Sequence, residues 1–297
     1  MNNLVKSYHT YAIITIIFWA LAFVLTRITI KYFSVFSLGF LRYFIASFIL
    51  AIVVIIFKIH FPDKNDLKWF ILSGLSGFAV YMVTFNKGCE TVSASTSSVI
   101  LATAPVITAI LARIIYNEII KPIQYFAILI EFIGVIILTM TNGIFTINSG
   151  IIWLLVSSIL ISFYNILQRK LTRKYTALQT TVYSIFCGEL FLFVFLPETV
   201  NEVKNIPIIQ FLYVAILGIF SSAIAYISWT KAISLVKHTS SVGNYMFLTP
   251  FLTAILGFII INEKPDIQTI FGGIIILGGL FLYNLGNSKL ADNPKNN

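Results

Sequence analysis

Ten long apolar stretches, separated by short polar gaps, dominate this sequence and limit the folds that it can adopt. A helix needs about 20 apolar residues to cross the hydrocarbon layer of a membrane, and each stretch comes close to that length. No gap is long enough for a soluble domain. We therefore predict an all-α integral membrane protein with ten transmembrane helices. The stretches are 11–30, 35–57, 67–86, 92–115, 122–141, 150–167, 177–196, 207–229, 240–261 and 267–283.

The composition supports a membrane protein over a soluble one. The 297-residue chain is 58% hydrophobic and 10% charged, whereas soluble proteins contain about 25% charged residues. The net charge of +9 would suggest a nucleic-acid partner in a soluble protein. Here the basic residues lie in short clusters between apolar stretches, which is typical of topology signals, so we expect no nucleic-acid partner. Cys89 and Cys187 form no CxxC motif and indicate neither a metal site nor a disulfide.

The basic residues also predict how the chain is oriented in the membrane. If both termini lie on one side, that side collects 14 of the 20 Lys and Arg residues and the other side collects five, with Arg42 inside the second stretch. Cytoplasmic loops carry the excess of Lys and Arg, so both termini should be cytoplasmic. The high Ile, Lys and Asn content is typical of a low-GC bacterium, and we expect a bacterial protein of this class in the cell membrane.

The chain repeats itself at a spacing of about 145 residues. Segment 105–118 is PVITAILARIIYNE and segment 250–263 is PFLTAILGFIIINE. Chance could match the Ile and Leu positions, but it does not easily match a Pro, a Thr and an Asn-Glu pair in register. Weaker matches flank this one, and they include Gly74 with Gly218 and Arg27 with Arg169.

The repeat divides the ten stretches into two halves of five. Because five is odd, the second half should cross the membrane in the opposite sense to the first. Such inverted repeats are typical of secondary transporters, in which the substrate site lies near the membrane midplane between the repeats. We therefore predict one five-helix repeat at 1–141, a second at 148–286 and a cytoplasmic tail at 287–297.

With these features the sequence resembles the drug/metabolite transporter superfamily, in particular its EamA-type transporters with ten helices. The resemblance covers about residues 10–285 and identifies the superfamily better than the substrate. Two positions depart from the family pattern: Ala20 follows Trp19 where the family often has Gly, and Glu131 stands where an apolar residue or Gly is usual. The features that carry the resemblance are Pro105 with Glu118, Pro250 with Glu263, Trp19, Gly39, Arg42, Tyr226, Trp229, Lys231 and Ala232.

The resemblance implies a secondary transporter that exports amino acids or other small metabolites by alternating access. It also implies a central cavity between six of the stretches, with 122–141 and 267–283 at the periphery. Polar groups at mid-membrane need hydrogen-bond partners, which a polar solute can provide, although any single aromatic side chain could simply pack. The substrate-binding candidates on the cavity stretches are Trp19, Phe23, Tyr81, Phe85, Thr103, Tyr164, Asn165, Gln168, Tyr226, Trp229, Asn244 and Tyr245.

Two prolines and three charges within the stretches are further candidates. Pro105 and Pro250 each remove a backbone donor, so we expect kinks that line the transport path or else serve packing. A charge facing lipid is costly, so Arg42, Glu131 and Glu189 should face the interior, find a partner or, for Arg42, extend to the interface. Glu131 and Glu189 could each bind a coupling proton or be structural carboxylates.

Two other functions remain open at this point. A membrane-embedded enzyme would need a nucleophile or a metal cluster at depth, but His9, His60 and His238 lie in gaps or at stretch ends, and the HExxH and GxSxG motifs are absent. We expect no catalytic residue, metal site or cofactor. A receptor or assembly protein without transport activity would leave the inverted halves unexplained. The expected partners are a small-molecule solute, membrane lipids and a proton gradient.

Overall fold

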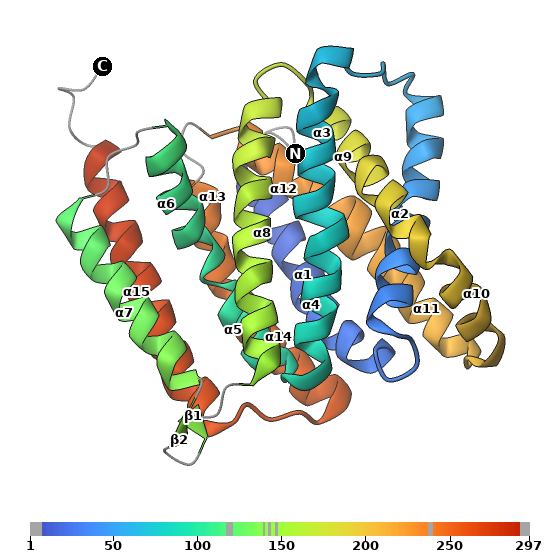
Figure 1. The fold of residues 1–297 in the computed structure, drawn as a ribbon. Coiled ribbons are helices and arrows are strands. Elements are labelled where there is room, and N and C mark those ends of the chain that lie inside the picture. The colour runs from blue at the N-terminus through green and yellow to red at the C-terminus, as the bar shows by residue number, and fades with distance from the viewer. Residues whose placement is uncertain are drawn as a thin grey trace.

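The computed structural model describes residues 8–116, 121–138, 140–141, 144–145, 148–236 and 240–291. The chain forms a bundle of helices (Figure 1). The first half contains α1 (Tyr8–Thr29), α2 (Val35–Ile56), η1 (Lys64–Asp66), α3 (Leu67–Gly74), η2 (Leu75–Ala79), α4 (Val80–Thr91), α5 (Ala94–Leu101), α6 (Ala104–Tyr116) and α7 (Pro122–Leu138).

A short strand pair joins the halves, with β1 (Met140–Thr141) antiparallel to β2 (Ile144–Phe145). The sequence did not indicate this pair. The second half contains α8 (Ser149–Leu171), α9 (Ala177–Leu192), η3 (Phe193–Phe195), α10 (Leu196–Glu202), η4 (Val203–Asn205), α11 (Ile208–Ile216), η5 (Leu217–Ile224), α12 (Ala225–Ser234), α13 (Ser240–Gly243), η6 (Asn244–Phe247), α14 (Leu248–Ile261) and α15 (Ile267–Ala291).

The helices have the length and surface of membrane-spanning segments. Within the described ranges, seven helical segments are long and apolar enough to cross a membrane, and three further apolar helices are shorter. Large apolar side chains are exposed on the outside of the bundle, including Ile208 at 88% and Phe48 at 62%. Exposing such an apolar surface to water is unfavourable, whereas lipid tails can cover it. The protein is thus a multi-pass helical membrane protein, and the number of ten crossings stays a prediction.

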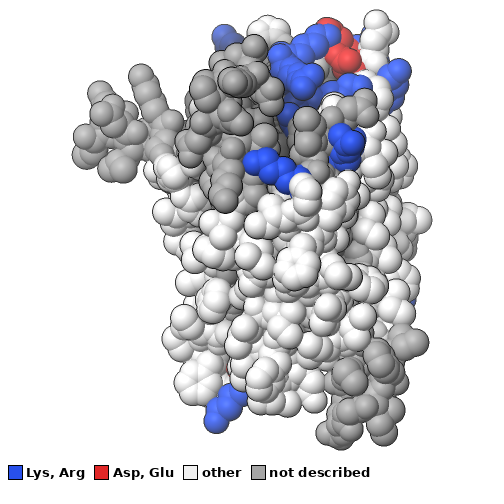
Figure 2. Space-filling model, turned by 90° about the vertical axis from the view of Figure 1, so that its left-hand side faces the viewer, with Lys and Arg blue, Asp and Glu red and all other residues white. Residues whose placement is uncertain are grey.

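Charged side chains are unevenly distributed along the bundle axis. Figure 2 shows Lys and Arg gathered at the upper end, an almost uncharged band below them, and little charge at the lower end of this face. The upper end is the one at which α1 starts and α15 ends in Figure 1. The distribution agrees with the basic-residue bias of the sequence.

Two predicted stretches have a different local structure from the one expected. Stretch 92–115 is divided at Ala102 and Thr103, where α5 ends and α6 begins. Stretch 177–196 does not end at Pro197, because the chain continues through η3 and α10 to Glu202. Pro197 lies at the first turn of α10. A backbone N–H at this position would have no partner within the helix, so the N–H that proline lacks is not missed. The helical segment therefore extends six residues beyond the predicted end of this stretch at 196.

Matching elements of the two halves make matching contacts. Helix α1 packs against α12, and α8 packs against α4. The π-helical segments η5 and η2 pack against α2 and α9, respectively. Gly218 in η5 and Gly74, the last residue of α3 before η2, allow close approaches here, because an added Cβ would lie 2.9 Å from the Arg42 carbonyl oxygen and 2.6 Å from the Gly188 nitrogen, respectively. Helices α7 and α15 pack side by side at one edge of the bundle (Figure 1).

Candidate functional site

A cavity lies in the middle of the bundle, between helices of both halves. Its volume, measured as the space open to the centres of water molecules, is about 40 Å³. The lining residues are Trp19, Ala22, Phe23, Arg42, Tyr81, Phe85, Ser98, Leu101, Ala102, Ile161, Tyr226, Met246 and Thr249.

Breaks in two helical segments supply part of this lining. Leu101 and Ala102 lie where α5 ends before α6, and Met246 and Thr249 lie where η6 passes into α14. Irregular backbone at membrane depth is tolerated where it borders a cavity or is buried in protein. Broken helices of this kind form the substrate sites of many transporters.

The predicted prolines lie directly after these breaks. Pro105 is the second residue of α6, and Pro250 is the third residue of α14. The first turn of a helix has no intrahelical partners for its N–H groups, so proline costs little there. The start of α6 also packs against α13 (Ser240–Gly243), which directly precedes η6, because an added Cβ on Gly243 would lie 3.3 Å from the Pro105 Cβ. A gating role for the prolines stays a prediction.

The π-helical segments position the aromatic wall of the cavity. Tyr81 and Phe85 follow η2 on α4, and Tyr226 follows η5 on α12. A π-helical turn rotates the following side chains relative to the preceding helix, and such turns are frequent at functional sites. The Trp19 and Tyr226 ring centroids are 5.2 Å apart, and those of Phe23 and Phe85 are 5.3 Å apart. All five of these predicted candidates line the cavity.

Other predicted candidates are occupied by contacts within the protein. The Trp229 indole N–H donates to Asn165 Oδ1 at 3.0 Å, and Asn165 Nδ2 donates to Thr108 at 3.5 Å. Tyr164 Oη lies 3.3 Å from the Thr230 hydroxyl. Buried polar groups need such partners, and these contacts satisfy them without a solute.

Three further substrate candidates, Gln168, Thr103 and Tyr245, lie outside the cavity lining. The Gln168 amide donates to Ser73 at 2.9 Å and to Ser184 at 3.2 Å. Thr103 donates to the Ile100 carbonyl at 2.7 Å, which is a contact within its own turn. The half-buried Tyr245 hydroxyl contacts His9. The Asn244 side chain lies outside the described part of the structure.

The three predicted membrane charges lie in different surroundings. Arg42 is 3% exposed and lines the cavity. Glu131 is also 3% exposed but lies between α7 and α15, where its Cγ would be 2.7 Å from an added Cβ on Gly279. Glu189 on α9 is 3% exposed, and neither of its carboxylate oxygens has a hydrogen-bond partner among the described residues. Neither glutamate lines the cavity.

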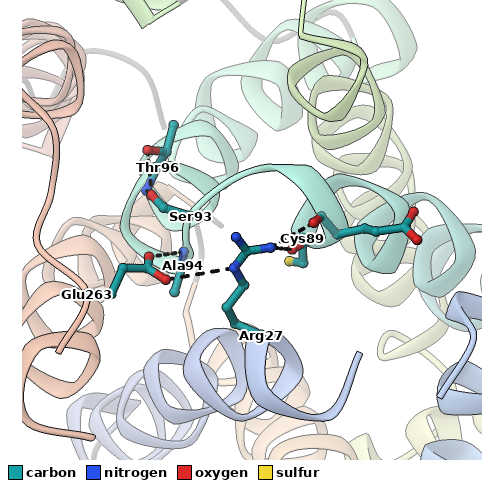
Figure 3. Close-up of polar contacts among 7 residues, drawn as sticks. Arg27, Cys89, Ser93, Ala94, Thr96 and Glu263 are labelled. Carbon is teal, nitrogen blue, oxygen red and sulfur yellow. Dashed lines mark hydrogen bonds and ion pairs between the residues drawn. The ribbon is translucent and has the colours of Figure 1, made fainter. Parts of the chain in front are cut away.

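A polar cluster connects Arg27, Glu263 and the residues at the end of α4 and the start of α5 (Figure 3). Arg27 Nη1 donates to the Cys89 carbonyl at 2.8 Å and to the Glu90 carbonyl at 2.7 Å. The Glu263 carboxylate accepts from the Ala94 N–H at 2.6 Å and lies 3.8 Å from Arg27 Nε. Ala94 is the first residue of α5, where the free N–H groups of a helix favour a negative charge. We call this group of contacts the Arg27–Glu263 closure.

The closure joins segments that are distant in the sequence. It links the end of α1, the end of α4, the start of α5 and the residues after α14. Sequence reasoning named Glu263 as a repeat position and as a feature of the family resemblance, and Arg27 as a weak repeat match, but it assigned neither residue a role. It also missed the small and apolar lining residues, because no sequence signal separates them from ordinary packing positions. Among the described residues, no group of three or more His, Cys, Asp and Glu side chains could hold a metal ion.

Comparisons with known proteins agree with this architecture. The EamA-like transporter family matches two segments, residues 6–140 and 148–285. A protein of solved crystal structure superposes with a TM-score of 0.67 at 14% sequence identity, covering 95% of this chain and 98% of that one. At that identity, the likeness shows the fold alone.

Related proteins are also named as transporters. "Uncharacterized transporter YdfC" of Bacillus subtilis (strain 168) is 29% identical over 92% of this chain and 89% of its own length. "Probable terminal-alkyne amino-acid exporter" of Streptantibioticus cattleyicolor is 27% identical over 95% of this chain and 96% of its own. "S-adenosylmethionine uptake transporter" of Rickettsia bellii is 27% identical over 82% and 81%. Because the family matches nearly the whole chain, this protein belongs to the EamA-like transporter family and is a membrane transporter.

Proposed function

We propose that this protein is a secondary transporter of the bacterial cell membrane that exports amino acids or other small metabolites by alternating access. The central cavity carries the proposal. Both halves line it, from Trp19 and Tyr81 in the first to Tyr226 and Thr249 in the second. A site shared by two repeats can open to either side when one repeat moves against the other.

The proposal includes ten crossings in two inverted repeats, at 1–141 and 148–286, with a cytoplasmic tail at 287–297. The double match to the family supports two repeats. The paired contacts of α1 with α12 and of α8 with α4 support a two-fold relation between them. The basic side chains at the upper end support cytoplasmic termini. The lower end, with the Arg27–Glu263 closure, is then extracellular.

The solute class and the direction rest on relatives. One related protein is named an amino-acid exporter, and another is named an S-adenosylmethionine uptake transporter. Both names refer to small organic metabolites, although they give opposite directions. The aromatic lining around Trp19 and Phe85 suits a solute with an apolar part.

Flux into proteoliposomes tests the transport function. Purified protein is reconstituted and offered amino acids, nucleosides, sugars and organic cations, with empty liposomes as the reference. We expect at least one class to move faster through the protein than through bare lipid. If no solute class moves faster than through empty liposomes, under either a proton or a sodium gradient, the proposal is rejected.

Two matched variants connect the flux to the cavity. Ala102→Phe places a large side chain in the cavity lining, where Ala102 is 1% exposed, and should abolish flux. Ile114→Phe makes a similar change on α6, at a side chain that is 69% exposed, and should retain flux. Equal flux through both variants would place the path elsewhere.

A coupling proton would need a titratable group, and Glu131 and Glu189 are the proposed candidates. Each is replaced by Gln, which keeps the shape and removes the titration. A residue that binds the coupling proton should lose the pH dependence of flux in its Gln variant. Unchanged pH dependence would remove that residue from the mechanism.

A further inference from the structure

We propose that the solute carries a carboxylate and that Arg42 is its counter-charge in the central cavity. The inference rests on the transport function proposed above and specifies the chemistry of its substrate. It concerns a single charged side chain in a cavity that is otherwise aromatic, aliphatic or uncharged.

Arg42 is held deep in the bundle rather than at the membrane surface. It is the eighth residue of α2, which places it roughly 10 Å from the start of that helix. Its side chain is 3% exposed, so it does not extend to the interface as interfacial arginines do. An arginine cannot lose its charge in a protein, so the positive charge remains at this depth.

Among the described residues, the partners of this guanidinium are neutral. Arg42 Nε donates to the Ser222 hydroxyl at 2.6 Å, and Nη1 lies 3.9 Å from Met82 Sδ. The guanidinium carbon is 5.9 Å from the centre of the Tyr43 ring. Guanidinium has five N–H donors, and these contacts leave several of them available. No carboxylate of the described residues lies within ion-pair distance of Arg42.

A buried charge without a counter-ion is costly, so its presence in a cavity points to a ligand that brings the opposite charge. A purely structural role would need only the contact with Ser222, which a neutral amide could make. Arginine is suited to carboxylates because its planar fork can bind both oxygens at once. Arg42 therefore indicates an anionic group on the solute.

The other lining residues limit the chemistry of the part of the solute that lies beside the carboxylate. The aromatic residues Trp19, Phe23, Phe85 and Tyr226 line the cavity, which favours an apolar body beside the carboxylate. An α-ammonium group is also compatible, because aromatic faces bind cations. The shared requirement is the carboxylate, whether the solute is an organic acid or an amino acid.

Binding of matched compounds tests the requirement in the unmodified protein. The full chain in nanodiscs is titrated with hydrocinnamate, its amide, its primary amine analogue and phenylalanine, and with isocaproate, its amide, its amine analogue and leucine. The intrinsic tryptophan fluorescence of the protein, to which Trp19 contributes from the cavity lining, reports binding. We expect the acid or amino acid of at least one series to bind about tenfold or more tighter than the matched amide and amine.

Variants assign the preference to Arg42. Arg42→Gln should remove the preference of acid over amide, whereas Arg42→Lys, which keeps the charge but not the fork, should keep part of it. Lys204→Gln removes the same charge from an exposed position and should keep the full preference. If Arg42→Gln does not fold, the wild-type comparison still decides the question.

The outcomes separate this inference from the transport function. Equal or tighter binding of the amides or amines, or no binding of any compound, overturns the inference. An unchanged acid preference in a folded Arg42→Gln protein also overturns it. Flux of an amine without any acid preference would leave transport standing and reject Arg42 as the counter-charge. Acid-selective binding without flux of any solute would support the binding site and reject transport.

Discussion

Removing the Glu263 carboxylate should open the lower end of the bundle. Glu263 connects the residues after α14 to the start of α5 and to Arg27 on α1. The Glu263→Ala variant deletes the acceptor of the Ala94 N–H and the partner of Arg27. Because these contacts join separate segments, they exist only while the lower ends of those segments lie together. Their loss should destabilise the closed state relative to the open one.

The size of the effect follows from the two contacts. The bond from the Ala94 N–H to the carboxylate is 2.6 Å long, and a hydrogen bond to a charged group contributes about 1.5–3 kcal/mol. The Arg27–Glu263 pair is 3.8 Å apart with side chains 27% and 19% exposed, and such a pair adds about 0.2–1 kcal/mol. A loss of about 2 kcal/mol shifts the equilibrium about thirtyfold. Glu263→Gln keeps an acceptor for Ala94, so about 1 kcal/mol and a fivefold shift are expected.

Sided cysteine labelling measures this shift. Cys89 and Cys187 are replaced by Ala, and Thr249→Cys introduces a thiol into the cavity lining, where Thr249 is 5% exposed. A membrane-impermeant maleimide is added to intact cells. While the closed state dominates, the labelling rate is proportional to the open fraction, so it should rise about thirtyfold in Glu263→Ala.

Two further variants control the interpretation. Asp266→Asn removes a negative charge from the same connection, where Asp266 accepts from the Thr269 N–H at 2.7 Å, and should leave labelling unchanged. Glu118 matches Glu263 in the sequence repeat and lies outside the described residues. Inverted repeats predict that Glu118→Ala lowers labelling from outside. An unchanged labelling rate in Glu263→Ala would refute the closure as a determinant of the equilibrium.

Two other substitutions test the close packing at Gly74 and the structural, rather than solute-binding, role of Trp229. Gly74→Ala should lower the melting temperature of the purified protein, because the new Cβ would lie 2.6 Å from the Gly188 backbone nitrogen, and overpacking typically costs about 1–3 kcal/mol. Gly278→Ala is the control, since nothing lies within 4 Å of its new Cβ, and a loss as large as that of Gly74→Ala would contradict the reasoning. Trp229→Phe removes the indole donor to Asn165 and should cost about 1–3 kcal/mol of stability with little change in solute preference, as a thermal melt and a competition assay would show.

The apolar pattern predicted the helical segments well but not their interruptions. Stretch 35–57 corresponds closely to α2 (Val35–Ile56), because a membrane helix satisfies its backbone internally and hydrophobicity alone marks its extent. The break at Ala102 and Thr103 leaves the hydrophobicity unchanged, so the pattern contains no trace of it. Pro105 signalled the irregularity only approximately, since proline is compatible with the first turn of a new helix.

The predicted candidate residues divide into those that line the cavity and those that bond within the protein. Tyr81 and Phe85 line the cavity, whereas Tyr164 and Gln168 are bonded to Thr230 and Ser73. All four are buried, and in the sequence they look alike. A polar group in the membrane interior needs a partner, but the sequence does not say whether that partner is a solute or another helix. The π-helical segment η2 adds to the difficulty, because it changes which face of α4 meets the cavity.

An unpaired arginine in the cavity would also connect solute binding to the conformational change. If Arg42 binds the solute carboxylate, closing the cavity around a bound solute buries a neutralised pair. Closing the empty cavity buries the unpaired Arg42 charge and removes part of its hydration, which costs more free energy. The empty protein would then pass between its two open states more slowly than the loaded one. Solute exchange across the membrane should accordingly be faster than net flux in wild type, and Arg42→Gln should reduce that difference even where it still binds a neutral analogue.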